Sequence, residues 1–216
     1  MYWLTKVYTF GRFGSNLYFH GSRKSNRIAL TFDDGLSDQT NKILRILDKN
    51  KCRGTFFLVG ERISGKKEIV RKIVTKGHEV GNHSYSHKNL LFKSQKTIEE
   101  EIALTEAEFS KLDVKTSLFR PPDGSFGLNL IKIISKKKLK AILWDVDPQD
   151  WKCNYDIGKI VNYILGHVRG GSIIDLHDYA IGVGENSKLV ELLRRVVPLL
   201  KEEGYEMVTV GELFGF

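Results

Sequence analysis

The chain has little cysteine, little proline and no long apolar run. Cys52 and Cys153 are its two cysteines, too few for a disulfide scaffold or a zinc finger, so we expect two reduced thiols. With four prolines and 41% hydrophobic residues, long disordered linkers are not expected. No window reaches the roughly eighteen apolar residues of a membrane-spanning helix, and the start lacks the order of a signal peptide. These absences predict one globular domain located in the cytoplasm.

Positive charge is in excess, with a formal net charge of +8. Most cations are dispersed among predicted helices without interleaved aromatic residues, so we do not expect a nucleic-acid partner. Residues 1–27 differ, because they contain five cations, no acidic residue and many aromatic residues. Such a segment can lie against the anionic inner face of a membrane. Alternatively, it can form a hairpin whose aromatic residues cover the core. We therefore treat residues 1–26 as a segment packed on or flanking a main domain of residues 27–216.

Short β-branched or aromatic runs alternate with amphipathic segments along the chain. The predicted strands are 27–32, 54–59, 78–81, 117–119, 140–146, 171–176 and 206–210. The predicted helices are 37–51, 66–76, 97–112, 128–138, 156–168 and 187–203. This alternation indicates an α/β fold with a mostly parallel sheet, either an open sheet or a barrel.

Polar residues follow the carboxyl ends of five predicted strands, which is the edge where active sites form in parallel α/β folds. They are Asp33 and Asp34, His83 and His87, the RPPDG run at 120–124, Asp145, Asp147 and Asp150, and His177 with Asp178. Two histidines four residues apart, together with a carboxylate, suit zinc and leave a coordination position for water. One of the two adjacent aspartates can then bind the metal while the other accepts a proton from that water.

Five ordered motifs resemble those of the polysaccharide deacetylases, the NodB-homology enzymes of carbohydrate esterase family 4. They are TFDDG (31–35), HSYSH (83–87), RPP (120–122), DPQDW (147–151) and the strand that ends at His177. The resemblance implies a single-domain, distorted (β/α)7 barrel. It also implies a metal-dependent hydrolase that removes an N-acyl group, N-acetyl in the first place, from an amino sugar.

The resemblance also implies roles for individual residues. Asp34, His83 and His87 would bind one divalent metal, zinc before cobalt, nickel or manganese. Asp33 would be the general base, held in place by Arg120. His177 would be the general acid, oriented through Asp147, because an amine is a poor leaving group unless it is protonated.

The substrate-binding residues that the motifs imply are Pro121, Pro122, Asp123, Trp151 and Asp175. Two of them depart from the family pattern, because Asp123 replaces an aromatic residue and Asp175 replaces a leucine. Alternation along the strand puts Asp175 on the same face as His177. It can therefore form an acidic wall of the acyl pocket, which suits acetyl poorly, or a structural partner for a lysine or arginine.

The substrate would be an N-acylated amino sugar in a polysaccharide, an oligosaccharide or a lipid-linked glycan. Deformylation or deacylation of a lipid-linked envelope sugar is an alternative that suits a cytoplasmic enzyme beside the membrane. A metal-independent relative that opens cyclic imides would not be expected to keep Asp34, His83 and His87 together. A catalytically idle binding module of the same fold is the remaining alternative.

Overall fold

Strands and helices alternate along the chain, as the pattern of apolar runs predicts. The computed structural model describes residues 16–152 and 155–216. Its strands are β1 (Leu17–Tyr18), β2 (Arg27–Asp33), β3 (Gly54–Leu58), β4 (Glu79–Asn82), β5 (Leu118–Phe119), β6 (Lys140–Ile142), β7 (Ile173–His177), β8 (Tyr179–Ala180), β9 (Gly184–Glu185) and β10 (Glu206–Val208). Its helices are α1 (Thr40–Lys49), α2 (Gly60–Ile63), α3 (Lys67–Thr75), α4 (Gln95–Ser110), α5 (Leu128–Lys137), α6 (Ile157–His167), α7 (Leu189–Glu202) and α8 (Val210–Phe214), with the 3-10 turn η1 (Pro122–Gly124).

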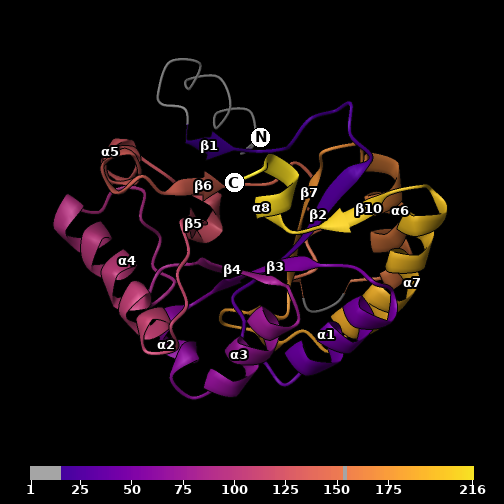
Figure 1. The fold of residues 1–216 in the computed structure, drawn as a ribbon, viewed down its shortest axis with the longest axis horizontal. Coiled ribbons are helices and arrows are strands. Elements are labelled where there is room, and N and C mark those ends of the chain that lie inside the picture. Colours follow the sequence, from indigo (N-terminus) through magenta and orange to yellow (C-terminus); the bar gives the residue numbers. More distant parts are fainter. Residues whose placement is uncertain (1–15, 153–154) are drawn as a thin grey trace.

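The main sheet is parallel, and the larger helices surround it (Figure 1). Its strands follow the order β1-β6-β5-β4-β3-β2-β10, and β7 pairs with β2. A bridge between Val146 and Ile174 joins the chain after β6 to β7, so the sheet curls toward closure. The predicted α/β fold of the distorted-barrel type is therefore confirmed.

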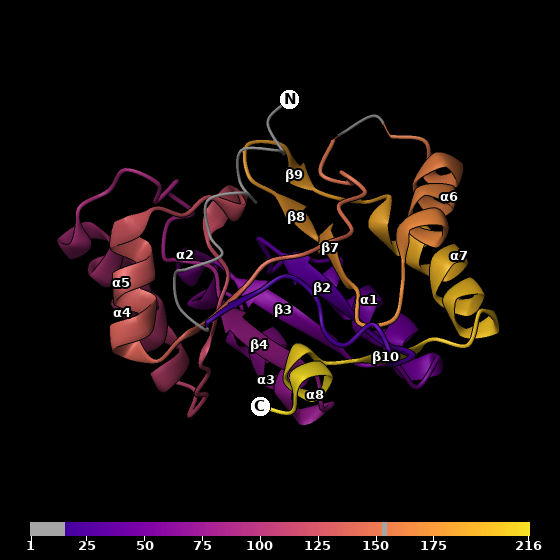
Figure 2. The same ribbon diagram turned by 90° about the horizontal axis from the view of Figure 1, so that it is seen from above.

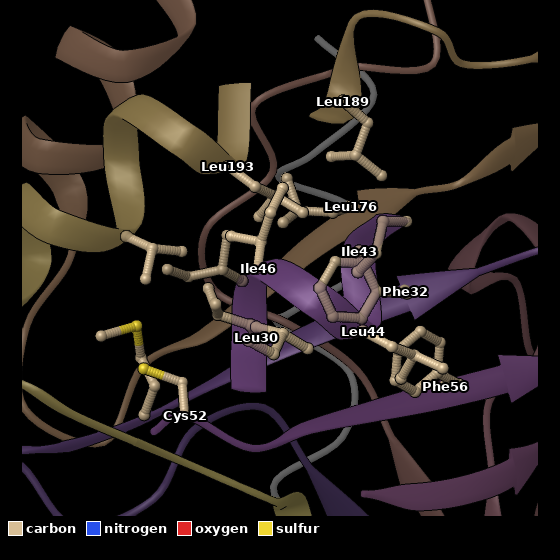
Figure 3. Close-up of a cluster of buried hydrophobic side chains, with 14 of the residues drawn as sticks. Leu30, Phe32, Ile43, Leu44, Ile46, Cys52, Phe56, Leu176, Leu189 and Leu193 are labelled. Atoms are coloured by element: carbon tan, nitrogen blue, oxygen red, sulfur yellow. The ribbon is translucent and has the colours of Figure 1, made fainter. Parts of the chain in front are cut away.

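The largest core cluster lies between β2, β3 and β7 and the helices α1 and α7. Figure 3 shows Leu30 and Phe32 of β2 beside Ile43 and Leu44 of α1, with Leu193 of α7 nearby. These side chains are at most 1% exposed. Burial of a large apolar side chain is worth about 1.5 to 3 kcal/mol, so this contact fixes α1 and α7 against the strand that ends at Asp33.

Two predicted strands end at least two residues earlier in the structure than in the sequence analysis. Residues 206–210 divide into β10 and α8, because Thr209 and Glu212 form a capping box that starts a helix. Residues 140–146 form β6 only as far as Ile142, and Val146 then bridges to β7. The apolar pattern continues through both segments, which is why it did not predict where the strands end.

The part of the segment 1–26 that the structure describes is joined to the sheet. Strand β1 pairs with β6, with Leu17 opposite Ala141, and the Tyr18 ring packs edge-on against Phe214 and Phe216. Residues 1–15, on which most of the membrane-contact hypothesis depends, lie outside the described residues. Within residues 16–152 and 155–216, no helix has the length and apolar character needed to cross a membrane.

Candidate active site

One cavity of about 360 Å³ opens at the carboxyl ends of the parallel strands. The motif residues in its wall come from segments that are far apart in the sequence: Asp33 and Asp34 after β2, His83 and His87 after β4, and Asp175 and His177 on β7. Strands β2 and β7 are paired with Asp33 opposite His177. The register of one strand pair therefore sets the two residues expected to act as base and acid side by side.

Asp34, His83 and His87 bring three ligand atoms within 4.8 Å of one another. Asp34 Oδ1 lies 3.3 Å from His83 Nε2 and 3.0 Å from His87 Nε2. It is buried and has no hydrogen-bond partner among the described residues. Burial works to raise the pKa of Asp34, but the two histidines outweigh it and hold that pKa well below its usual range. A buried carboxylate oxygen that lies between two imidazole nitrogens fits a divalent cation.

The ring of His83 is oriented by the backbone. Its Nδ1 lies 2.8 Å from the carbonyl oxygen of Arg120, and a carbonyl oxygen can only accept, so Nδ1 carries the proton. In the neutral ring Nε2 is then free to act as a ligand, which is the arrangement usual for metal-bound histidine. The residues present therefore fit the metal that the motifs imply.

Arg120 holds the carboxylate of Asp33. The arginine is fully buried, and its Nη1 donates to Asp33 Oδ1 at 2.7 Å and to Thr31 Oγ1 at 2.8 Å. Its Nε and Nη2 donate to the carbonyl oxygens of Ile142 and Leu143. With its other donors committed to the backbone, the guanidinium cannot rotate away from Asp33. Asp33 Oδ2 is left facing His83, 3.6 Å from Nε2.

His177 is oriented by Asp150 and not by Asp147, which corrects the sequence-based assignment. Asp150 Oδ1 lies 2.9 Å from His177 Nδ1, and Asp150 Oδ2 accepts the His177 backbone N–H at 3.0 Å. Asp147 instead accepts the backbone N–H of Gln149. Both aspartates follow β6 in one loop, and the loop turns so that only the second reaches β7. Burial works to lower the pKa of His177, but Asp175 and Asp150 together hold it well above its usual value.

Asn186 is a further polar partner of the acid that the sequence analysis did not single out. Its Nδ2 donates to Asp150 Oδ2 at 3.1 Å, to the Asp150 carbonyl and to the His177 carbonyl. Its Oδ1 accepts from the hydroxyl of Tyr155 at 3.0 Å. Asn186 thus ties the loop that carries Asp150 to the strand that carries His177. It belongs to no recognised motif, and no sequence signal distinguishes it.

The hairpin of β8 and β9 lies next to the end of β7 (Figure 2) and contributes Ala180, Ile181 and Val183 to the cavity wall. The backbone N–H of Ile181 donates to Asp34 Oδ2 at 3.3 Å. Ile181 and Val183 are large apolar residues that are 45% and 53% exposed. The hairpin therefore contacts a candidate metal ligand and also gives the cavity an apolar rim.

The residues expected to bind substrate are not all in the cavity wall. Asp123 and Trp151 line it, together with Asp147. Pro121 and Pro122 are buried and are not among the residues that line this cavity, so their contact with substrate stays a prediction. They shape the turn η1 that brings Asp123 to the wall. Trp144 also lines the cavity.

Asp175 is an ion-pair partner and a wall residue at once. Its Oδ1 accepts from Arg120 Nη1 at 3.0 Å, and its Oδ2 lies 3.9 Å from His177 Nε2. It is 2% exposed and lines the cavity. Burial and the neighbouring Asp33 raise the pKa of Asp175 well above its usual value. The two interpretations from the sequence, an acidic pocket wall and a partner for arginine, thus apply together.

Comparison with known proteins identifies related sequences over most of the chain. The family model for polysaccharide deacetylase matches residues 20–142. A peptidoglycan-N-acetylglucosamine deacetylase of Bacillus cereus is 34% identical over 192 residues, which are 88% of each protein. A peptidoglycan-N-acetylmuramic acid deacetylase of Bacillus subtilis is 36% identical over 86% of this chain and 38% of its own length.

Solved structures show the same fold. The crystal structure of a peptidoglycan N-acetylglucosamine deacetylase in complex with a naphthalenyl N-hydroxybenzamide has a TM-score of 0.87 and 33% identity, and the match covers 93% of both chains. A family 4 pseudoenzyme from Bacillus anthracis has a TM-score of 0.83 and 28% identity over 91% of this chain and 68% of its own. The same architecture therefore occurs in active and in inactive proteins.

Proposed function

Because the chain belongs to the polysaccharide deacetylase family, we propose that it hydrolyses the N-acyl amide of an amino sugar in a glycan. The relatives act on N-acetylated sugars of peptidoglycan, which supports a glycan substrate and N-acetyl as the reference acyl group. The observation that carries the proposal is the convergence of Asp33, Asp34, His83, His87 and His177 on one cavity.

Asp34, His83 and His87 would hold one divalent metal. When bound, the metal supplies Lewis acidity, which polarises the amide carbonyl and makes water easier to deprotonate. Two imidazoles and one carboxylate suit zinc and leave a position open for substrate or water. Cobalt, nickel and manganese accept the same kinds of donor, so zinc is the first but not the only candidate.

Asp33 takes the proton of the attacking water. Its Oδ1 is occupied by Arg120, so Oδ2, on the side of His83, is the oxygen that receives the proton. The fixed arginine keeps this carboxylate in one position throughout the reaction, which limits the reorganisation that the transition state requires.

His177 gives a proton to the leaving nitrogen. Its Nδ1–H is committed to Asp150, so Nε2 is the atom that carries the proton to be donated into the cavity. Asp175 and Asp150 raise the pKa of His177, which favours the protonated ring that a general acid requires. Water thus supplies OH to the acyl carbon and, through Asp33 and His177, hydrogen to the amine.

Assays with and without zinc on a panel of N-acylated chitin and peptidoglycan fragments test this proposal. We expect release of the free carboxylic acid that depends on added metal and is abolished by EDTA. The matched variants are Asp33→Asn, which removes the base, and Asp145→Asn, which changes an aspartate outside the cavity that pairs with Arg23. Absence of hydrolysis on every substrate with stoichiometric zinc bound would contradict the proposal and favour an idle binding module.

The idle binding module is a second candidate because a related pseudoenzyme exists. Against it, the base, the acid and all three candidate ligands are present here and face the same cavity. A lipid-linked substrate, membrane contact and a cytoplasmic location stay predictions. Fractionation of the native protein and assays on lipid-linked sugars would test them.

A further inference from the structure

Asp175 lies one layer deeper in the barrel than the two residues proposed to move protons. In the pairing of β2 with β7, Asp33 is opposite His177, while Asp175 is opposite Thr31, two residues earlier on each strand. Side chains two residues apart on a strand point the same way, and both Asp175 and His177 line the cavity. Asp175 therefore forms the floor of the cavity directly below the base and the acid.

One oxygen of this buried carboxylate is left over after its ion pair is made. Arg120 Nη1 has two hydrogens and already faces three acceptors, on Thr31, Asp33 and Asp175. Asp175 Oδ2 makes no hydrogen bond within the described residues, and it lies 3.9 Å from His177 Nε2. Because Asp175 lines the cavity, this oxygen can accept a hydrogen bond from a donor that enters it.

In the pose that the proposed mechanism requires, the acyl group of the substrate reaches this floor. The amide carbon must be within reach of a water on Asp33, and its nitrogen within reach of His177 Nε2, so the amide spans the two residues. The sugar extends from the nitrogen toward the open mouth. The remaining substituent of the carbonyl carbon then points inward toward Asp175, where a methyl group would face an unpaired polar oxygen.

We propose that Asp175 selects N-acyl groups that carry a hydroxyl on the carbon next to the carbonyl, of which N-glycolyl is the smallest, over N-acetyl. A hydroxyl can donate to a carboxylate, or both donate to and accept from a carboxylic acid, whereas a methyl group can do neither. This inference rests on the proposed function, because it names the acyl group for the same reaction. Hydrolysis would release glycolate and the free amine, with water providing OH to the acyl carbon and hydrogen to the nitrogen.

The test compares N-glycolyl and N-acetyl chitooligosaccharides of equal length as substrates of the zinc-loaded protein. For the wild type we expect kcat/KM for the N-glycolyl substrate to be about tenfold to a hundredfold higher, the range that one hydrogen bond to a charged group provides. Asp175→Leu, which fills the floor with an apolar side chain, should reverse the preference. Asp175→Asn, which retains hydrogen-bonding capacity, should keep a reduced preference for N-glycolyl.

A binding measurement separates this inference from the proposed function. Calorimetric titration of the two oligosaccharides into Asp33→Asn, with and without Asp175→Leu, reports selectivity without turnover. Asp145→Asn serves as the control for loss of an aspartate outside the cavity and should leave the substrate ratio unchanged. Thermal unfolding of each variant shows whether it is folded.

Equal or better hydrolysis of the N-acetyl substrate by the wild type would overturn the inference while the proposed function stands. The same holds if the wild type prefers N-glycolyl but Asp175→Leu keeps that preference. Absence of hydrolysis on both substrates would contradict the proposed function. In that case, tighter binding of the N-glycolyl oligosaccharide would still support the selectivity of Asp175, and equal binding would overturn it.

Discussion

Two histidines at opposite ends of the barrel have pKa values that move in opposite directions. His177 ends β7 at the cavity, and His78 immediately precedes β4 at the other end of the sheet. Burial works to lower the pKa of both side chains. At His78 the effect of burial is the larger one, and the pKa is lowered. Asp48 Oδ1, 3.8 Å from His78 Nε2, offsets that effect only in part. At His177 it is outweighed by Asp175 and Asp150, and the pKa is raised.

The difference shows how charged neighbours at the carboxyl ends of the strands change the effect of burial on a pKa. At the amino end, burial shifts both groups toward their neutral forms, because it lowers the pKa of His78 and raises the pKa of Glu79. At the cavity, two histidines favour the charged form of Asp34, and Asp175 and Asp150 favour that of His177, although burial still raises the pKa of Asp175. We therefore expect changes at the cavity to alter catalysis and changes at the amino end to alter stability, and the following experiments test that separation.

The largest effect is expected from removing the metal ligands. The His83→Ala, His87→Ala double variant should bind no stoichiometric zinc and lose hydrolysis completely, because a single carboxylate does not retain the metal. Metal analysis of the purified protein measures the zinc content, and a substrate assay measures the remaining hydrolysis. The fold should persist, since its core needs no metal. Full zinc content in the double variant would contradict the ligand assignment.

The next largest effect is expected from the base and the acid. Asp33→Asn and His177→Ala should each lower kcat by about 10² to 10⁴, the usual contribution of one general acid or base. Zinc content should stay close to one per chain in both variants, which separates these roles from metal binding. If either variant retained the kcat of the wild type, its assigned role would be wrong.

A smaller effect distinguishes Asp150 from Asp147. Asp150→Asn should lower the pKa of His177, because it removes a negative charge that holds that pKa up. The acid acts while protonated, so activity should fall off at a lower pH on the alkaline limb of the pH–rate profile. Asp147→Asn should move that limb less, since Asp147 has no hydrogen bond to His177 among the described contacts. Equal shifts would restore Asp147 as an orienting residue.

The smallest effect concerns His78 and stability. Burial lowers its pKa in the fold, so the unfolded chain takes up the proton first as the pH falls. The contribution of His78 is therefore complete above about pH 6.5 and is lost below it, by at most about 1.4 kcal/mol per pH unit. His78→Gln should reduce the difference in unfolding free energy between pH 7.5 and 5.5, measured by urea titration. An unchanged difference, or a large loss of kcat, would contradict the separation of the two ends.

The features that were predicted correctly from the sequence are those that depend on the periodicity of its side chains. Residues 27–32 were expected as a strand, and β2 covers Arg27–Asp33. Alternation on β7 also placed Asp175 and His177 on one face, and both line the cavity. The sequence could not show whether Asp147 or Asp150 orients His177, because the two aspartates lie in a loop without periodic structure. The contact from Ile181 to Asp34 comes from a backbone N–H, so no side chain could have indicated it.

Strand β2 pairs with three others, with β10 along residues 27–29, with β3 along residues 30–32 and with β7 along residues 29–33. Its partners begin at residues 54, 173 and 206, so the strand is complete only when distant parts of the chain have assembled around it. Amide hydrogens in such a strand exchange with solvent mainly through global unfolding. Asp33 is the last residue of this strand. Local opening of the loops around the cavity should therefore leave the position of the proposed base unchanged.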